Sequence, residues 1–449
     1  MLEVTYIGFI GFILIGISYI SNSKLLLNLT VFFIPFSATS AINFGESEQG
    51  SSVQIYMLFS LSWMAYQVFR FLRDYQPYKS ITVPRATSLL LSFLLAAFFS
   101  LLMPLYINGA DTANSTGRYA DYELIEFKSS NITQYLYLVS GAFFSICFGL
   151  IVSERDFTSI LKTYTYSVIF VMLWGLYELF CFYTDTEYMA YIFNNNIHES
   201  AKGYTEVLLT ATEPVKRIAS VTLEPSFLAQ VLLALLPFYV YSCLNRAYIF
   251  GRKSDLAILL FLLLYIPLTT SSTAVVGLVF VFVLLFYKTY RKNAFFVYYT
   301  LGFICLLCLL VYSLSDNIFY NLIIKEKSET SSGIERMSSI VDGWDTFTKY
   351  PLLGVGWGTV SSHDLIIKIA ANCGLIGLAL FIYFVYFLLK RLNFKSQLDS
   401  NHPFYKSTSL SLSVILFCNI ISGFSFYLGH LWFILGLSLA LAKHKYQPL

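Results

Sequence analysis

Two stretches of the chain combine charged side chains with proline or glycine, and both come directly before long apolar runs. The first ends in Arg217-Ile-Ala-Ser-Val-Thr-Leu-Glu224-Pro225-Ser226. Proline suits the first position of a helix, and a carboxylate is favoured at the N-terminal end of the helix dipole. Glu224 is therefore expected to be either a helix cap or a carboxylate of a site. Arg217 is expected either to pair with Glu224 or to bind an anion.

The second stretch is richer in glycine. Arg336 is followed by Pro351-Leu-Leu-Gly-Val-Gly-Trp-Gly358 and then by His363. Three glycines in so short a segment require a tight turn or a close approach of the backbone. The segment is not a phosphate-binding P-loop, because the Gly-Lys-Ser/Thr ending is absent.

The helix expected after this stretch carries a face of small residues, Ala370, Gly374 and Gly377. Such a face lets another helix approach closely. His363 falls on the same face, which predicts that it points into the interior of a helix bundle. The alternative is a loop histidine that caps the helix.

Glu178 is the one acidic residue inside a predicted membrane span. A carboxylate within a span is costly, so it is a candidate functional residue unless it reaches the nearby interface. His430 is a weaker candidate of the same kind.

Together these residues suit transfer of a group from a pyrophosphate. Arginine side chains bind phosphate oxygens and stabilise the charge of a diphosphate as it leaves. Histidine or glutamate can take the proton of an attacking sugar hydroxyl. His363 is thus the first candidate for the base and Glu224 the second, and the substrate-binding candidates are Arg217, Arg336 and Glu178. No cluster has the spacing of metal ligands, so no metal or other cofactor is expected.

The composition determines what kind of fold can position these groups. Of the 449 residues, 57% are hydrophobic and 12% are charged, about half the charged fraction of an average soluble protein. This excludes a soluble enzyme, a disordered chain and a nucleic-acid binder. The apolar runs are long rather than alternating, which predicts helical spans and not porin strands. The expected fold class is an all-α polytopic membrane protein that forms one integral membrane domain over residues 1–449.

The apolar runs predict about 13 transmembrane helices, within a range of about 12–14. They lie at 4–20, 25–44, 53–69, 86–107, 133–152, 160–183, 226–242, 256–271, 273–287, 294–313, 365–389, 407–425 and 428–442.

Lysine and arginine are concentrated in alternate loops between these spans. Basic loops lie on the cytoplasmic side of a membrane, which places the N-terminus outside and the C-terminus in the cytoplasm. Two long polar loops, 184–225 and 314–364, then lie on the external side. Long loops of compact proteins often carry function, so the site is expected at the outer face.

The motifs resemble those of a bacterial membrane family. Arg217-x-x-Ser220-x-x-x-Glu224-Pro225-Ser226 resembles the segment before a membrane helix in O-antigen and capsule polymerases of the Wzy type. Arg336, the 351–358 segment and His363-x10-Gly374-x-x-Gly377 look like a block shared by those polymerases and the O-antigen ligases.

The resemblance implies an inverting, metal-independent glycosyltransferase of GT-C architecture in the bacterial cytoplasmic (inner) membrane, with its site on the periplasmic side. It implies undecaprenyl-pyrophosphate-linked oligosaccharides as donor and acceptor, membrane lipid around the protein, and a Wzz-type chain-length regulator as a partner. A polymerase is favoured, because the ligase pattern ordinarily has threonine after the last glycine, where this chain has Leu378. The alternatives are an O-antigen ligase or an O-oligosaccharyltransferase of the same superfamily. A transporter of lipid-linked oligosaccharides is less favoured, because the spans are nearly free of charge.

Overall fold

The computed structural model describes residues 2–21, 23–45, 51–74, 83–113, 122–197, 202–209, 214–289, 298, 302, 331–399, 402–423 and 426–443.

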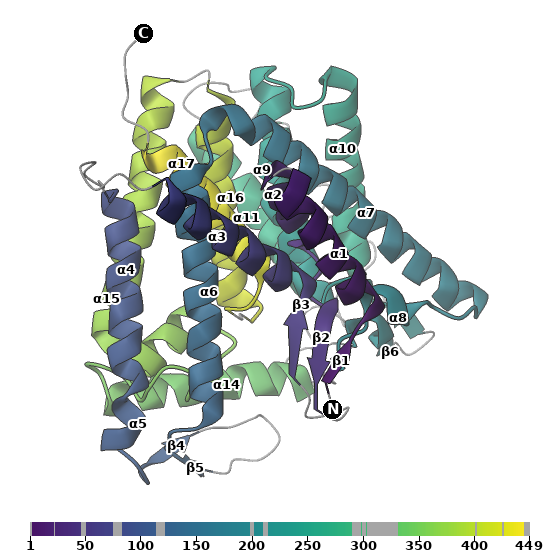
Figure 1. Cartoon of the computed structure of the whole chain (residues 1–449). Helices are drawn as coiled ribbons and strands as arrows, with labels where there is room; N and C mark the ends of the chain where they lie inside the picture. The colour runs from purple at the N-terminus through teal and green to yellow at the C-terminus, as the bar shows by residue number, and fades with distance from the viewer. Residues whose placement is uncertain are drawn as a thin grey trace.

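The described residues form a bundle of apolar helices (Figure 1). Six helical segments among them are long and apolar enough to cross a membrane. They comprise α4 (Arg85–Leu101) continued by α5 (Met103–Tyr106), α6 (Ser129–Ile151), α7 (Phe157–Thr184) preceded by η1 (Glu154–Asp156), α9 (Pro225–Asn245), α15 (Leu365–Leu398) and α16 (Pro403–Ile421). Shorter apolar helices are α1 (Tyr6–Ser21), α2 (Ser23–Phe33), α11 (Ser272–Thr289) and α17 (Gly429–Lys443). The prediction of an all-α polytopic membrane protein is confirmed.

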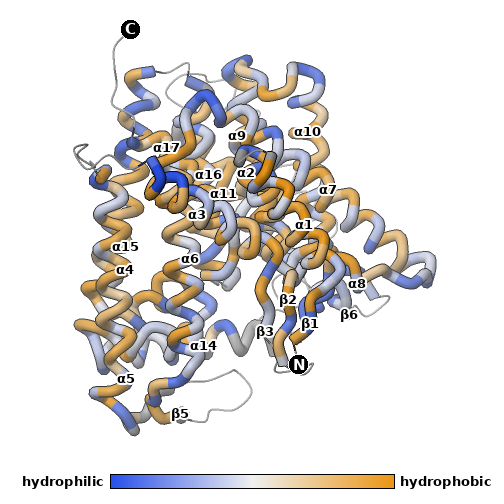
Figure 2. Tube along the Cα trace, in the orientation of Figure 1, coloured by the Kyte–Doolittle hydropathy of each residue, from blue (hydrophilic) through white to orange (hydrophobic). Residues whose placement is uncertain are grey.

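Two further helices also correspond to predicted spans, α3 (Ile55–Arg73) and α10 (Arg252–Tyr265). The helix α10 continues into the short 3-10 helix η4 (Ile266–Thr269). Each predicted span overlaps one of these helices except 294–313, which lies outside the described residues apart from positions 298 and 302. Figure 2 shows that polar stretches gather near both ends of the bundle, with mainly apolar helical segments between them.

The predicted span 25–44 is wrong in its second half. The helix α2 ends at Phe33, and the chain then turns through Pro35 into a strand at Ser40–Phe44. Proline lacks a backbone N–H and its ring opposes the continuation of a helix, which explains the early end.

Three small antiparallel sheets lie outside the helices, and in Figure 1 they gather toward one end of the bundle. The first contains β1 (Leu2–Val4), β2 (Ser40–Phe44) and β3 (Ser51–Gln54) in that order. The second pairs β4 (Asp111–Ala113) with β5 (Tyr122–Leu124), and the third pairs β6 (Val207–Leu209) with β7 (Pro214–Lys216). Pairing satisfies backbone groups that no helix satisfies.

The helix α9 forms the centre of the core. Nearly all its side chains are buried, and it contacts α16, α11, α10 and α7. A helix that is apolar all round belongs in the interior of a bundle. The segment before its first residue, Pro225, is thereby fixed at one end of the bundle.

Both predicted long loops contain secondary structure. Residues 184–225 include α8 (Ala190–Phe193), η3 (Gly203–Thr205), β6 and β7, and residues 314–364 include α14 (Ser331–Lys349). In Figure 1, α14 runs crosswise to α4 and α6 near the end where the strands lie, and it packs against α15 and β4.

Candidate functional site

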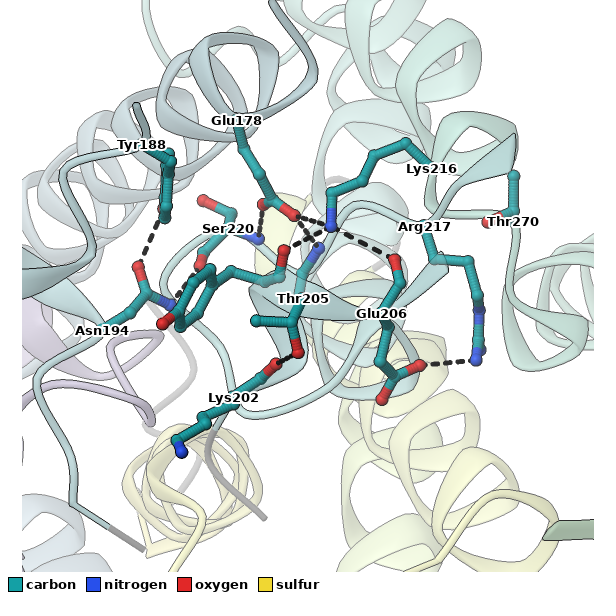
Figure 3. Close-up of polar contacts among 12 residues, drawn as sticks. Glu178, Tyr188, Asn194, Lys202, Thr205, Glu206, Lys216, Arg217, Ser220 and Thr270 are labelled. Carbon is teal, nitrogen blue, oxygen red and sulfur yellow. Dashed lines mark hydrogen bonds and ion pairs between the residues drawn. The ribbon is translucent and has the colours of Figure 1, made fainter. Parts of the chain in front are cut away.

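A buried ion pair fixes the segment that leads into α9 (Figure 3). Glu178, on α7, is 2% exposed, and its Oε1 lies 2.9 Å from Lys216 Nζ. Its Oε2 accepts a hydrogen bond from the backbone N–H of Ser220 at 2.6 Å. Lys216 also donates to the carbonyl oxygens of Tyr204 and Glu206. Glu178 therefore faces the protein interior and anchors the 216–220 segment, rather than pointing toward the interface.

Ser220 takes a backbone conformation that is unusual for a residue with a side chain, with φ at +54°. Three contacts hold it there: the bond to Glu178, a bond from its hydroxyl to Val171 O at 2.6 Å, and a bond from Asn194 Nδ2 to its carbonyl at 2.7 Å. Strained backbone of this kind persists only where the surroundings determine it. The turn between Arg217 and α9 is thus rigidly positioned.

Arg217 pairs with Glu206, and not with Glu224 as one reading of the sequence suggested. Its Nη1 lies 2.5 Å from Glu206 Oε2, with the two side chains 21% and 35% exposed. Burial raises the pKa of the Glu206 carboxyl; Glu224 also raises it, whereas Arg217, Lys216 and Arg336 oppose the shift. These groups from both predicted loops are therefore close enough to interact electrostatically.

Glu224 occupies the N-cap position of α9, which begins at Pro225 as predicted. Its side chain makes no capping hydrogen bond to the helix. Instead, Oε2 accepts a hydrogen bond from Ser226 Oγ at 2.9 Å. The half-buried carboxylate is therefore not used to cap α9 and stays available for a role in the site.

Arg336 and His363 are joined through Ser339. Ser339, on α14, is 3% exposed, and its Oγ lies 2.9 Å from Arg336 O and 3.1 Å from His363 Nδ1. The Nε atoms of Arg336 and Arg217 are both buried and have no hydrogen-bond partner within the described residues. Two guanidinium groups with spare donors are suited to an anion with several oxygens.

The ring of His363 is neutral at physiological pH. Burial, together with the smaller effects of the nearby cations Arg336 and Lys368, lowers its pKa to about 4. A neutral imidazole can accept a proton, as a general base must. The helix N-cap next to it is Asp364, whose Oδ1 accepts from Ile367 N at 2.9 Å, so His363 is not the helix cap.

The glycine-rich segment docks on a break in α15. Gly374 has φ of +63° inside this helix, which frees backbone groups for the segment before it. Leu375 N donates to Pro351 O at 2.7 Å, and Val355 N donates to Ala371 O at 3.0 Å. A Cβ at residue 374 would lie 2.3 Å from the backbone carbon of Leu352. The close approach predicted at Gly374 is real, but a loop makes it and not another helix.

Two asparagines hold the other side of this segment. Asn372 Oδ1 accepts from the backbone N–H groups of Thr359 and Val360, both at 3.0 Å. Asn131, on α6, donates to Trp357 O at 2.9 Å and to Thr359 Oγ1 at 3.0 Å. The polar contacts of the segment thus go to helices on both sides, and they fix the approach to His363.

The structure therefore groups the predicted residues in two ways. One group is close enough to interact electrostatically, and it contains Arg217, Glu224, Arg336 and His363. Glu206 interacts with the first three of these residues. His363 interacts with Arg336 and contacts Ser339. Glu178 is not in this group, but it holds the segment that carries Arg217 through its contacts with Lys216 and Ser220. His430 is buried, with Nε2 2.8 Å from Gln230 Oε1.

Sequence reasoning missed Glu206, Lys216 and Ser339. None lies in a motif, and each acts through a partner distant in sequence, so no local signal identifies them. Within the described residues, no group of three or more His, Cys, Asp or Glu could hold a metal ion.

Comparison with known proteins adds one finding. Residues 257–382 match the family model described as O-antigen ligase (Wzy_C). This range runs from α10 into α15 and includes Arg336, the glycine-rich segment and His363. The search of curated proteins found no match. Over this segment, the chain is similar to the O-antigen ligase family.

Proposed function

We propose that the protein is an inverting glycosyltransferase that polymerises undecaprenyl-pyrophosphate-linked oligosaccharide units. It works without a metal ion, as one integral membrane domain of the bacterial inner membrane, with its site on the periplasmic side. The observation that carries this proposal is the shared neighbourhood of Arg217, Arg336 and His363 at one end of an apolar helix bundle.

The two arginines bind the donor pyrophosphate. The unpartnered Nε of Arg336, and that of Arg217, offer hydrogen bonds that the described residues do not use. Guanidinium groups in a partly buried site stabilise the negative charge that develops on a departing diphosphate. Glu206 orients Arg217 through one nitrogen, which leaves the other donors available.

The neutral ring of His363 accepts the proton of the acceptor hydroxyl. The hydroxyl oxygen forms a bond to the anomeric carbon, and the bond from that carbon to the pyrophosphate oxygen breaks. The electron pair of the broken bond leaves with undecaprenyl pyrophosphate. Glu224 has a supporting role from the N-terminal end of α9.

Glu178 supports binding indirectly, by holding Lys216 and the backbone of Ser220. It thereby positions Arg217. The substrate-binding role expected for Glu178 from the sequence is in this proposal a positioning role.

The Glu-Pro-Ser segment and Leu378 after Gly377 favour a polymerase over a ligase. In an O-antigen ligase or O-oligosaccharyltransferase, the same donor chemistry would deliver the glycan to a different acceptor. A Wzz-type regulator is the partner that a polymerase would need to set chain length.

Reconstitution in liposomes tests this proposal. Purified protein receives lipid-linked repeat units alone or together with lipid A–core, and the products are separated by gel and identified by mass spectrometry. Growth of lipid-linked chains is the expected result. Transfer only to lipid A–core would indicate a ligase, and movement of unchanged glycans across the bilayer would indicate a transporter.

A further inference from the structure

Ser339 connects the two central residues of the proposed site. Its hydroxyl oxygen lies 2.9 Å from Arg336 O, in the geometry of a donor to that carbonyl. The same oxygen lies 3.1 Å from His363 Nδ1 and accepts from the backbone N–H of His363 at 3.3 Å. Because Ser339 is 3% exposed, water does not replace these contacts easily.

Proton counting decides which nitrogen of His363 carries hydrogen. A serine hydroxyl has one hydrogen, and its shorter contact is to the carbonyl oxygen of Arg336. If that hydrogen is used there, the contact to Nδ1 requires Nδ1 to be the donor. A neutral imidazole carries one N–H, so Nε2 then has a free lone pair.

We infer that Ser339 is a positioning residue that holds His363 in the Nδ1–H tautomer and thereby presents an unprotonated Nε2 to the acceptor hydroxyl. This inference rests on the proposed function, because it assigns the nitrogen through which His363 acts as base. Within the described residues, Nε2 has no hydrogen-bond partner.

A glycine lies close to the edge of the ring that carries Nε2. Gly423, with φ of +90°, lies against the Cδ2 edge of the ring, where an added Cβ would lie 3.2 Å from Cδ2. Cδ2 is bonded to Nε2, so a residue without a side chain lies beside this edge of the ring. Ser339 and Gly423 therefore hold the ring from different sides.

Kinetics give the first test. In Ser339→Ala, the kcat for chain growth should fall by about 10-fold to 100-fold, less than most of the ~10²-fold to 10⁴-fold contribution of general base catalysis, because the base itself is still present. The KM for the lipid-linked substrate should stay within about 2-fold, because the phosphate-binding arginines are unchanged. Ser339→Thr keeps the hydroxyl and should restore most of the loss. Thr346→Val is the matched control, because Thr346 is another buried hydroxyl of α14 and donates to Asp342 O of its own helix at 2.7 Å.

Nitrogen NMR gives a readout that a merely structural role would not change. In protein labelled with ¹⁵N and ¹³C histidine, the signals of His363 are assigned as those absent from His363→Gln. Correlation with the ring carbons then shows which nitrogen is protonated. Wild type should show Nδ1–H at neutral pH, and Ser339→Ala should show a mixture of tautomers or the Nε2–H form.

The outcomes separate the inference from the proposed function. If His363→Ala is inactive while Ser339→Ala has wild-type kcat, the base role stands and the inference about Ser339 is wrong. An Nε2–H tautomer in wild type overturns the inference even if Ser339→Ala does not fold. A slow Ser339→Ala with an unchanged tautomer also overturns it. If His363→Ala polymerises normally, the proposed base and the inference fail together.

Discussion

At the scale of residues, one cation serves two opposing requirements. In the proposed function, Arg336 supplies positive charge for a leaving pyrophosphate, and the same charge adds to the burial that lowers the pKa of His363. A lower pKa keeps the ring neutral and ready to accept a proton, but it also makes the ring a weaker base. We propose that donor binding relieves this conflict, because a bound pyrophosphate would offset the charge of the guanidinium when the base is needed.

The pH dependence of the reaction follows from this arrangement. Protonation of His363 removes the base, so kcat/KM should fall on the acid side with an apparent pKa near the free-enzyme value of about 4. Bound pyrophosphate favours the protonated ring, so the acid limb of kcat should lie at higher pH than that of kcat/KM. Rates of chain growth measured from pH 4 to 8 check this. An acid limb of kcat below that of kcat/KM would contradict it.

Replacement of Arg336 by lysine tests the nature of the phosphate contact. An ammonium group keeps the charge but cannot form two parallel hydrogen bonds. Arg336→Lys should therefore reduce kcat/KM by about 10²-fold to 10³-fold, the range for loss of one transition-state donor. Arg391→Lys, on the distant end of α15, is a matched control and should keep full activity. Near wild-type rates for Arg336→Lys would show that charge alone suffices.

At the scale of elements, the link between α7 and the segment before α9 depends on one buried ion pair. Removing one partner of such a pair leaves a buried charge without compensation, at a cost of about 3–5 kcal/mol. Glu178→Gln should thus lower the unfolding temperature in detergent and raise the KM for donor, because Arg217 loses its fixed position. Glu187→Gln replaces an exposed carboxylate just after the same helix and serves as the control. An unchanged unfolding temperature for Glu178→Gln would refute the anchoring role.

The helix α14 has an unusual distribution of side chains. Its exposed face carries Met337, Val341 and Trp344, which are 65%, 49% and 52% exposed. Spacings of four and three residues place them on one face. An exposed apolar face opposite a polar buried one is typical of a helix in the membrane interface.

Spin labels can test the position of α14. Labels at residues 337, 341 and 344, introduced one at a time in liposomes, should be accessible to oxygen and protected from a water-soluble nickel relaxant. A label at Asp345, which is also exposed, serves as the comparison and should show the reverse. Equal access of the nickel reagent to all four positions would place α14 in water.

The elements differ in how far the sequence predicts them. Long apolar runs identify membrane helices because burial in lipid requires such runs, and the helices at 86–107 and 133–152 lie where expected. The length of the apolar run also led to a second span that extends through Ser40–Phe44, which is a strand. Hydropathy alone gives no sign that the helix ends near Pro35. The hydropathy criterion also overlooked α14. The buried face of this helix is polar, and its apolar residues are spaced along one face instead of forming a continuous apolar run.

The candidate site shows a similar limit. Arg336 and His363 could be identified because each has a residue type suited to phosphate or proton transfer and lies near a distinctive glycine pattern. Their connection through Ser339 and the pairing of Arg217 with Glu206 arise from tertiary contacts between segments that the sequence treats as separate loops. Which carboxylate pairs with Arg217 depends on the path of the backbone. The spacing of residues in the sequence does not reveal that path.

At the scale of the whole molecule, the proposed site requires residues 184–225 and 314–364 to lie on the same side of the membrane. Single cysteines at Asp345 and Gln397, both exposed positions, can be placed in a protein without native cysteines and exposed to a membrane-impermeant maleimide in intact cells. Asp345→Cys should react from outside, and Gln397→Cys should react only after the membrane is opened. Labelling of Gln397→Cys in intact cells would reverse the proposed orientation.

The central claim is that Arg336 and His363 act together in glycosyl transfer from a lipid-linked pyrophosphate. The most direct measurement is the release of undecaprenyl pyrophosphate per enzyme in liposomes that contain lipid-linked repeat units. Wild type should release one molecule for each unit added to the glycan, while folded His363→Ala should still bind donor but release none above background. Release by His363→Ala at the wild-type rate, or chain growth without release, would contradict the account.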